Sequence, residues 1–128
     1  MSNKIAIAAC GGMSPNGLIS RVASADAVNE TPNTISICMG ATSGDKTGFS
    51  ELIKKYPIIA VNGCESGCVN KILLNRGVKT IDSIDITAIL NETPYKANDV
   101  SRLDDEGEKC VKIIKNTIQK LIKTRRNI

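Results

Sequence analysis

The sequence predicts an α/β protein with three layers, in which helices cover both faces of a small, mostly parallel sheet of about four strands. Two observations predict this class. Short apolar segments that end at Gly, Pro or polar residues alternate about four times with segments of helical periodicity. Right-handed crossovers between parallel strands then place helices on both faces, as in Rossmann-like and flavodoxin-like proteins. The length of 128 residues fits a single domain over residues 1–128 and allows an aliphatic core without disulfides.

The first half of the chain predicts two strands and two helices. The apolar segment 4–9 is short and stops at Gly11-Gly12, which is typical of a buried parallel strand. Ser14 followed by Pro15 predicts a helix start, because Ser caps a first turn and Pro suits its first residue. The expected order is strand 4–9, helix 14–29, strand 34–39, polar loop 40–48 and helix 49–56.

The second half predicts two further strands and two helices. Gly77 suits the C-terminal end of a helix, and residues 87–90 are ambiguous in type. Ser101 and Asp104 form a Ser-x-x-Asp helix start, and the acidic first turns and basic last turns of that helix match its dipole. The expected order is strand 57–61, helix 65–76, strand 78–86, loop 91–99 and a basic amphipathic C-terminal helix at about 101–124.

Basic charge is concentrated in the last twenty residues. Residues 1–108 carry a net charge of −3, whereas residues 109–128 carry +7. These side chains could contact phosphates, but a solvated helix face explains the same residues, and we favour it because an apolar stripe lies opposite. With aromatic residues at only 2 %, base stacking has little support, so we do not expect nucleic acid as a partner. The basic residues are Lys109, Lys112, Lys115, Lys120, Lys123, Arg125 and Arg126.

The chain has five Cys and no His, which excludes every mechanism that needs an imidazole. The apolar stretch Ile5–Ala9 is too short for a signal peptide or a membrane span, so we expect a soluble cytoplasmic protein with no membrane partner. Thiols stay reduced in the cytoplasm. Five cysteines are therefore better explained there by metal binding, redox chemistry or catalysis than by structural disulfides.

Four of the cysteines follow predicted strands. Cys10 comes directly after the first strand, Cys38 ends the second, Cys64 follows the third and Cys68 lies one helical turn later. If the strand order is 2-1-3-4, these strand ends lie about 4.8 Å apart and the thiols can converge. Four thiolates predict a tetrahedral site, for which zinc is the default ion. The alternative is that each Cys is a small buried hydrophobe, the role we assign to Cys110 on the last helix.

The residues around this edge favour negative charge. Helix starts at Ser14 and Glu65 would direct their N-terminal amides toward it, where they would stabilise thiolates or hold an anionic or other small-molecule ligand. Ser14 itself is expected to be a cap rather than a nucleophile. The glycines allow either close backbone approach or turns with positive φ. They are Gly11, Gly12, Gly17 and Gly63.

The ordered set of these motifs resembles the DGC-motif family of proposed zinc-binding proteins, which is named for Asp-Gly-Cys. The resemblance rests on Cys10-Gly11-Gly12-Met13-Ser14, on Cys38 and on Asn62-Gly63-Cys64-Glu65 with Cys68, and it covers about residues 5–80. It implies Cys10, Cys38, Cys64 and Cys68 as zinc ligands, but no reaction. This chain departs from the family at Asn62, where the family has Asp. Asn removes a negative charge there but can still hydrogen-bond to a thiolate.

Two other functions compete with a zinc site. Residues 40–47 between a strand and a helix resemble a phosphate-binding P-loop, but only three residues separate the glycines and Asp45 stands where Gly should precede Lys. A polar loop beside Cys38, acting as a lid, is the simpler interpretation. Thiol chemistry is the stronger alternative, with Cys64 or Cys68 as a nucleophile or redox pair, although the Cys-x-x-x-Cys spacing differs from thioredoxin-like pairs. Whether the protein is an enzyme stays open.

Overall fold

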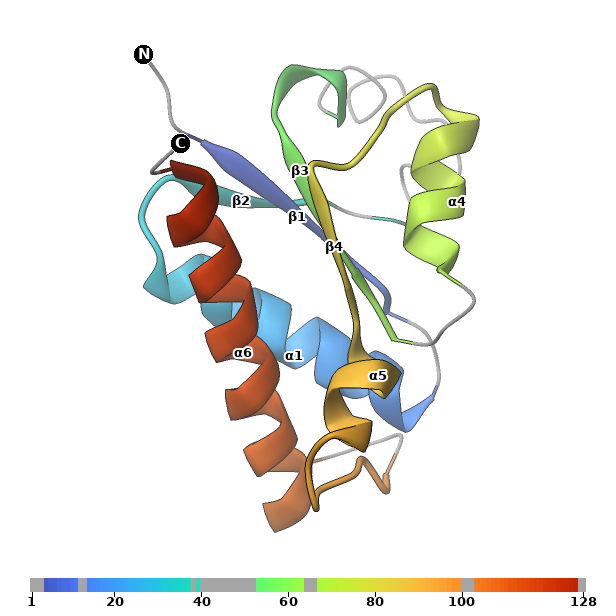
Figure 1. Cartoon of the computed structure of the whole chain (residues 1–128), viewed down its shortest axis with the longest axis vertical. Helices are drawn as coiled ribbons and strands as arrows, with labels where there is room; N and C mark the ends of the chain where they lie inside the picture. The colour runs from blue at the N-terminus through green and yellow to red at the C-terminus, as the bar shows by residue number, and fades with distance from the viewer. Residues whose placement is uncertain are drawn as a thin grey trace.

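The structure is a computed structural model that describes residues 4–11, 14–37, 39, 53–63, 67–99 and 103–126. Strands and helices alternate along the described chain (Figure 1). In chain order they are β1 (Ile5–Ala9), α1 (Pro15–Glu30), β2 (Thr34–Ile37), β3 (Ile58–Asn62), α4 (Cys68–Asn75), β4 (Asp82–Asp85), α5 (Ile86–Asn91) and α6 (Asp105–Arg126). The predicted α/β class is confirmed.

The four strands are parallel, as predicted, and their order across the sheet is β2-β1-β3-β4, the order that the convergence of the cysteines requires. Ala8 pairs with Ile37 and Ala9 pairs with Val61, so the carboxyl ends of β2, β1 and β3 lie at one edge. The chain passes from β1 through α1 to β2 on one side, and from β3 through α4 to β4 on the other. The strand order therefore reverses between β1 and β3, which is where sheets of this kind bind ligands.

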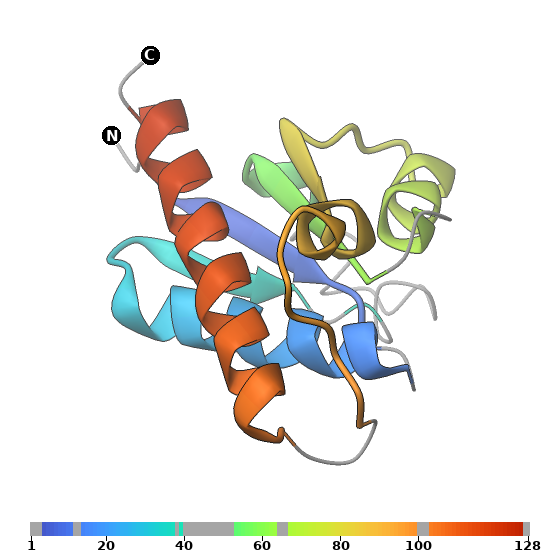
Figure 2. The ribbon, with the colours of Figure 1, turned by 60° about the horizontal axis from the view of Figure 1, so that its bottom comes forward.

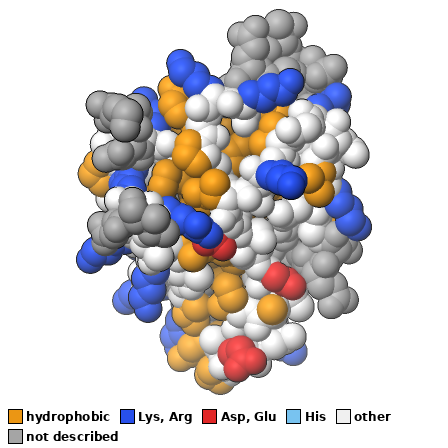
Figure 3. Space-filling model, turned by 45° about the horizontal axis from the view of Figure 1, so that its top comes forward, with side chains coloured by type: hydrophobic (Ala, Val, Ile, Leu, Met, Phe, Trp, Pro, Cys, Tyr) orange, Lys and Arg blue, Asp and Glu red, His pale blue; other side chains and the backbone are white. Residues whose placement is uncertain are grey.

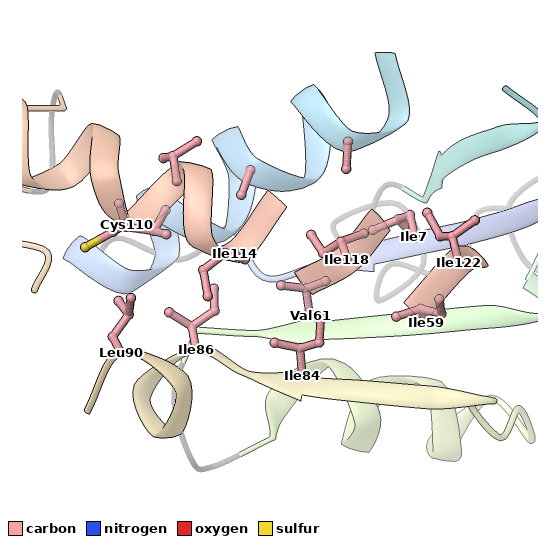
Figure 4. Close-up of a cluster of buried hydrophobic side chains, with 14 of the residues drawn as sticks. Ile7, Ile59, Val61, Ile84, Ile86, Leu90, Cys110, Ile114, Ile118 and Ile122 are labelled. Atoms are coloured by element: carbon pink, nitrogen blue, oxygen red, sulfur yellow. The ribbon is translucent and has the colours of Figure 1, made fainter. Parts of the chain in front are cut away.

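Helices α1, α5 and α6 cover one face of the sheet (Figures 1 and 2). Alternate strand residues such as Ile7 and Val61 point to this face, because successive side chains in a strand point to opposite sides. Figure 4 shows a stripe of side chains on α6 directed toward these strand residues and toward α5. The stripe consists of Cys110, Ile114, Ile118 and Ile122, at most 1 % exposed. The stripe is the apolar face that the sequence predicted for this helix.

Helix α4 covers the opposite face. The intervening strand residues, such as Ala6 and Ala60, pack there against Val69 and Leu73 of α4 and against Ile53. All five are at most 2 % exposed. The sheet therefore has a closed apolar core on each side, and the predicted three-layer arrangement is confirmed.

Two helices begin later than predicted. Helix α4 begins at Cys68 rather than Glu65, because Gly67 has φ of 64° and cannot continue a right-handed helix. Helix α6 begins at Asp105, because Asp104 caps it: the Gly107 amide donates to Asp104 Oδ1 at 2.7 Å. The predicted cap Ser101 lies outside the described residues.

The fourth strand is shorter than predicted. Residues 78–80 are not in the sheet, since the Val78 amide donates to Leu73 O at 2.9 Å where α4 ends, with Gly77 at φ of 75°. The Asp85 side chain accepts a hydrogen bond from the Ala88 amide and starts α5 directly after β4. The ambiguous segment 87–90 is thus helical. Similarly, β2 ends at Ile37 instead of Met39.

Several predictions fall on parts of the chain that the structure does not describe. The loop 40–48, including the P-loop-like residues, lies outside the described residues, as does most of the helix predicted at 49–56. Residues 53–55 of that helix are helical. In the described part of the chain, no helix combines the length and apolar character needed to cross a membrane.

Candidate functional site

Cys10 lies at the carboxyl edge of the sheet, one residue beyond β1. Its amide donates to Val61 O at 2.9 Å, which extends the β1–β3 ladder by one residue and holds Cys10 beside the end of β3. Its half-buried side chain packs against the apolar cluster on the α4 face. Cys10 is therefore on the same side of the sheet as α4.

Cys68 is the first residue of α4 and is exposed. Gly67 precedes it as the N-cap residue and offers no side chain to the helix amides. Asn62, the last residue of β3, supplies the missing acceptor, since the Val69 amide donates to Asn62 Oδ1 at 3.0 Å. The position of Cys68 is thus set by a direct hydrogen bond between β3 and the residue that follows it.

Asn62 is the buried centre of a polar chain, with 5 % of its surface exposed. Its Nδ2 donates to Asn70 Oδ1 at 2.6 Å and to Ile84 O at 3.5 Å, and Asn70 Nδ2 donates in turn to Thr80 Oγ1 at 3.2 Å. The chain joins β3, α4, the segment after α4 and β4. The sequence pointed to Asn62 as a residue of the site, but it gave no such indication for Asn70 and Thr80. A polar residue in the third position of α4 was the available signal for Asn70, once the helix start is placed at Cys68.

Ser14 and Gly63 bring α1 to the other side of the same edge. The Gly17 amide donates to Ser14 Oγ at 3.0 Å, which confirms Ser14 as the helix cap. A Cβ at Gly63 would lie 3.3 Å from Gly17 N and 3.4 Å from Asn16 O. Gly63 is therefore needed for close backbone approach. Its φ is not positive, because Gly67 and Gly77 are the positive-φ glycines among the described residues.

A polar bridge ties α5 to this edge. Asn16 Nδ2 donates to Thr87 Oγ1 at 3.1 Å, and that hydroxyl donates to Gly63 O at 3.3 Å. A shallow pocket of about 220 Å³ lies here, between Ser14, Gly63 and Thr87. Asn16 and Thr87 had no sequence signal, because their pairing spans 71 positions.

Two of the four predicted zinc ligands, Cys10 and Cys68, lie in the part of the chain that the structure describes. Cys38, Cys64 and the predicted neighbour Gly12 lie outside the described residues, next to the described residues Ile37, Gly63 and Gly11. Gly11 is exposed, and an added Cβ there would meet no atom within 4 Å. In the described ranges, no three His, Cys, Asp or Glu side chains form a group that could hold a metal. The four-cysteine site stays a prediction.

Cys110 differs from Cys10 and Cys68 in its surroundings. It is fully buried between α6 and α5 (Figure 4), as the sequence predicted for a packing residue. Burial raises the pKa of its thiol, and the nearby carboxylates of Glu106 and Asp104 raise it further. Cys110 is therefore a protonated thiol at neutral pH, unsuited to bind metal or attack a substrate.

Several basic side chains of α6 have partners within the chain. Lys115 pairs with Glu30 at 3.2 Å, Arg125 pairs with Asp82 at 3.2 Å, and Lys109 lies 5.1 Å from the centre of the Tyr95 ring. Figure 3 shows Lys and Arg side chains dispersed over one face rather than gathered in one patch. This arrangement favours a solvated helix face.

Comparison with known proteins identifies a family for this chain. Searches of curated proteins and of solved structures found no match. A family model described as DGC domain matches residues 6–114, from β1 into α6, and so extends well beyond the segment that the cysteine motifs cover. The chain therefore belongs to the DGC domain family.

Proposed function

We propose that this protein binds one zinc ion through the thiolates of Cys10, Cys38, Cys64 and Cys68 at the carboxyl edge of the sheet. A reducing cytoplasm would keep these thiols available to the metal. Zinc accepts four thiolates in tetrahedral geometry, and the chain offers no His as a competing ligand. The family match supports the proposal, because the resemblance to this family implies these four cysteines as zinc ligands.

One structural observation carries the proposal. Cys10 and Cys68 are 58 positions apart, yet both are tied to the last two residues of β3. The Cys10 amide bonds to Val61 O, and the residue after Cys68 bonds to the Asn62 side chain. Both cysteines belong to the α4 side of the sheet. Cys64 follows Asn62 by two residues in sequence, so three of the four proposed ligands are connected to the end of one strand.

The fold supports a binding site more than a structural brace. Structural zinc stabilises small domains that lack a sufficient core, whereas this sheet has a closed apolar core on both faces. Cys10 also lies at the reversal of strand order between β1 and β3, where α/β sheets bind ligands, and this supports a binding role. If one of the four thiolates were released in exchange for a ligand, bound zinc would supply a Lewis acid for that ligand at this edge. The protein would hold the ion and orient the ligand.

Metal analysis of the purified protein tests the proposal. We expect about one zinc per chain, lost when Cys64 and Cys68 are both changed to Ser. Cys110→Val is the matched control, because it removes a thiol that packs in the core, and it should leave the zinc content unchanged. Circular dichroism of each variant shows that the protein is folded. Zinc content that is absent in the wild type, or equal in the Cys64/Cys68 variant, would contradict the proposal.

Thiol chemistry without metal is the second candidate, and the exposure of Cys68 favours it. An exposed thiol at the first residue of a helix is accessible to oxidants and disulfides. Its reaction with a disulfide reagent distinguishes the two functions. Metal-free protein as isolated, with Cys68 reacting at the same rate before and after zinc addition, would support the thiol function. Protection of Cys68 by stoichiometric zinc would support the metal site.

A further inference from the structure

A second pocket lies on the α1 side of the sheet, between α1 and the carboxyl halves of β1 and β2. Its volume is about 220 Å³, equal to about seven water molecules at ~30 Å³ each. Its wall is apolar at Ile7, Ala9 and Ile37, and among the described residues no acidic side chain lines it. The polar groups on its wall come from Arg21 and Ser24 of α1 and from Ser36 of β2.

Ser24 is an unusual residue for this wall. It is 4 % exposed, and its Oγ has no hydrogen-bond partner within the residues that the structure describes. Buried hydroxyls in native proteins nearly always have a partner, because an unpaired one costs free energy. Because the Oγ atom itself is buried, a molecule in the pocket reaches it only after the Ser24 side chain changes rotamer, and that molecule then supplies the missing partner.

Arg21 places a positive charge at the same pocket. It lies one helical turn before Ser24 and Ala25, so the three residues share one face of α1. Arg21 is exposed, and in the described ranges no ion pair or hydrogen bond engages it. By contrast, Lys115 and Arg125 on α6 are paired with carboxylates. An unneutralised guanidinium beside two hydroxyls favours an anionic group.

We propose that this pocket binds a small organic anion, whose charged group is held by Arg21 and whose short apolar body lies against Ile7 and Ala9. The hydroxyls of Ser24 and Ser36 complete the recognition of its polar end. Cys10 and Gly11 also line the pocket, although the Cys10 side chain packs toward the α4 face of the sheet, so a bound anion lies beside the segment that carries one proposed zinc ligand. The walls consist of protein atoms alone. Binding is therefore expected with or without zinc, and its failure would leave the metal proposal standing.

Amide chemical shifts of ¹⁵N-labelled protein test the proposal with two probes, butyrate and inorganic phosphate. We expect saturable shifts at Gly11, Ala25 and Ser36 with at least one anion, in both metal-free and zinc-loaded protein. Butylamine, which carries the opposite charge, should cause none. A response to butyrate alone identifies a carboxylate with an apolar body, whereas a response to phosphate alone identifies the anionic group as the recognised part.

Variants distinguish this pocket from general anion binding. Arg21→Gln should weaken binding about tenfold. Lys120→Gln, which removes the same charge from an exposed position on α6, should leave binding unchanged. Ser24→Ala should weaken binding while leaving the melting temperature equal or higher, because it removes an unpaired buried hydroxyl. The absence of saturable shifts with both anions, or equal affinities in wild type and Arg21→Gln, would overturn the proposal.

Discussion

At the scale of single residues, Asn62 has the most consequential contacts at the candidate site. It supplies the acceptor that Gly67 cannot provide, and it links β3 to α4 at Val69, the residue directly after Cys68. The family has Asp at this position. An Asp would still accept the Val69 amide hydrogen bond, but it could not donate to Asn70 Oδ1 or Ile84 O. The cap, rather than the charge, is therefore the function that both residue types share.

Substitution of Asn62 tests this role. Asn62→Ala removes the acceptor for the Val69 amide and should lower the free energy of unfolding of the metal-free protein by about 1–2 kcal/mol. Asn62→Asp keeps the acceptor and adds a negative charge near a helix N-terminus, so it should lose less. Urea unfolding measures both. Equal losses in the two variants would show that the donor side of Asn62, not the cap, stabilises this edge.

Cys110 allows a prediction about pH. Its pKa is raised in the folded state by burial and by the carboxylates of Glu106 and Asp104, whereas the unfolded thiol titrates near its ordinary value of about 8.5. Below that pH both states hold the proton and the contribution of Cys110 to stability is fully present. As the pH rises above it, the unfolded chain releases the proton first, so the free energy of unfolding falls. We expect this decline to be smaller in Cys110→Val, as measured by urea unfolding between pH 7 and 10.

At the scale of elements, the contact between α1 and the end of β3 is the tightest at this edge. The backbone of Asn16 and Gly17 approaches Gly63 so closely that a side chain has no room. Neither α1, capped by Ser14, nor β3, paired on both sides, can shift easily. The glycine is thus required by the packing of two elements and not by the conformation of its own backbone.

Two glycine substitutions separate these effects. Gly63→Ala should lower the free energy of unfolding by about 1–3 kcal/mol, because the new Cβ lies 3.3–3.4 Å from backbone atoms. Gly11→Ala is the matched control, since its Cβ would meet no atom within 4 Å, and its effect should be below about 0.5 kcal/mol. Thermal unfolding of both variants measures the difference. Similar losses in the two would refute the argument from packing.

At the scale of the whole molecule, the parts that could be predicted from sequence are those with local signals. Hydrophobic runs, the Ser14-Pro15 start and the Gly77 stop predicted the sheet and most helices, and the α/β alternation predicted that the strands are parallel. The predicted element boundaries were wrong where one residue ends a strand and its side chain also caps a helix. Asp85 ends β4 and its side chain caps α5, and Asn62 ends β3 and its side chain accepts from the first turn of α4. Contacts such as that of Asn16 with Thr87 depend on the completed fold and have no local signal.

The closed core on both faces of the sheet also predicts how the protein responds to loss of metal. Apolar side chains from every described strand are buried against helices on one face or the other, and the sheet is held by three parallel pairings that involve no cysteine side chain.

Zinc-dependent small domains unfold when metal is removed, because their cores are insufficient without it. Here chelation should leave the far-ultraviolet circular dichroism and a cooperative thermal transition intact. Zinc at a free concentration of about 100 times its Kd should then add ~2.7 kcal/mol to the free energy of unfolding. A chain that lost its secondary structure on chelation would instead make the proposed zinc a structural brace, because the energy of the site would then be part of the energy of folding.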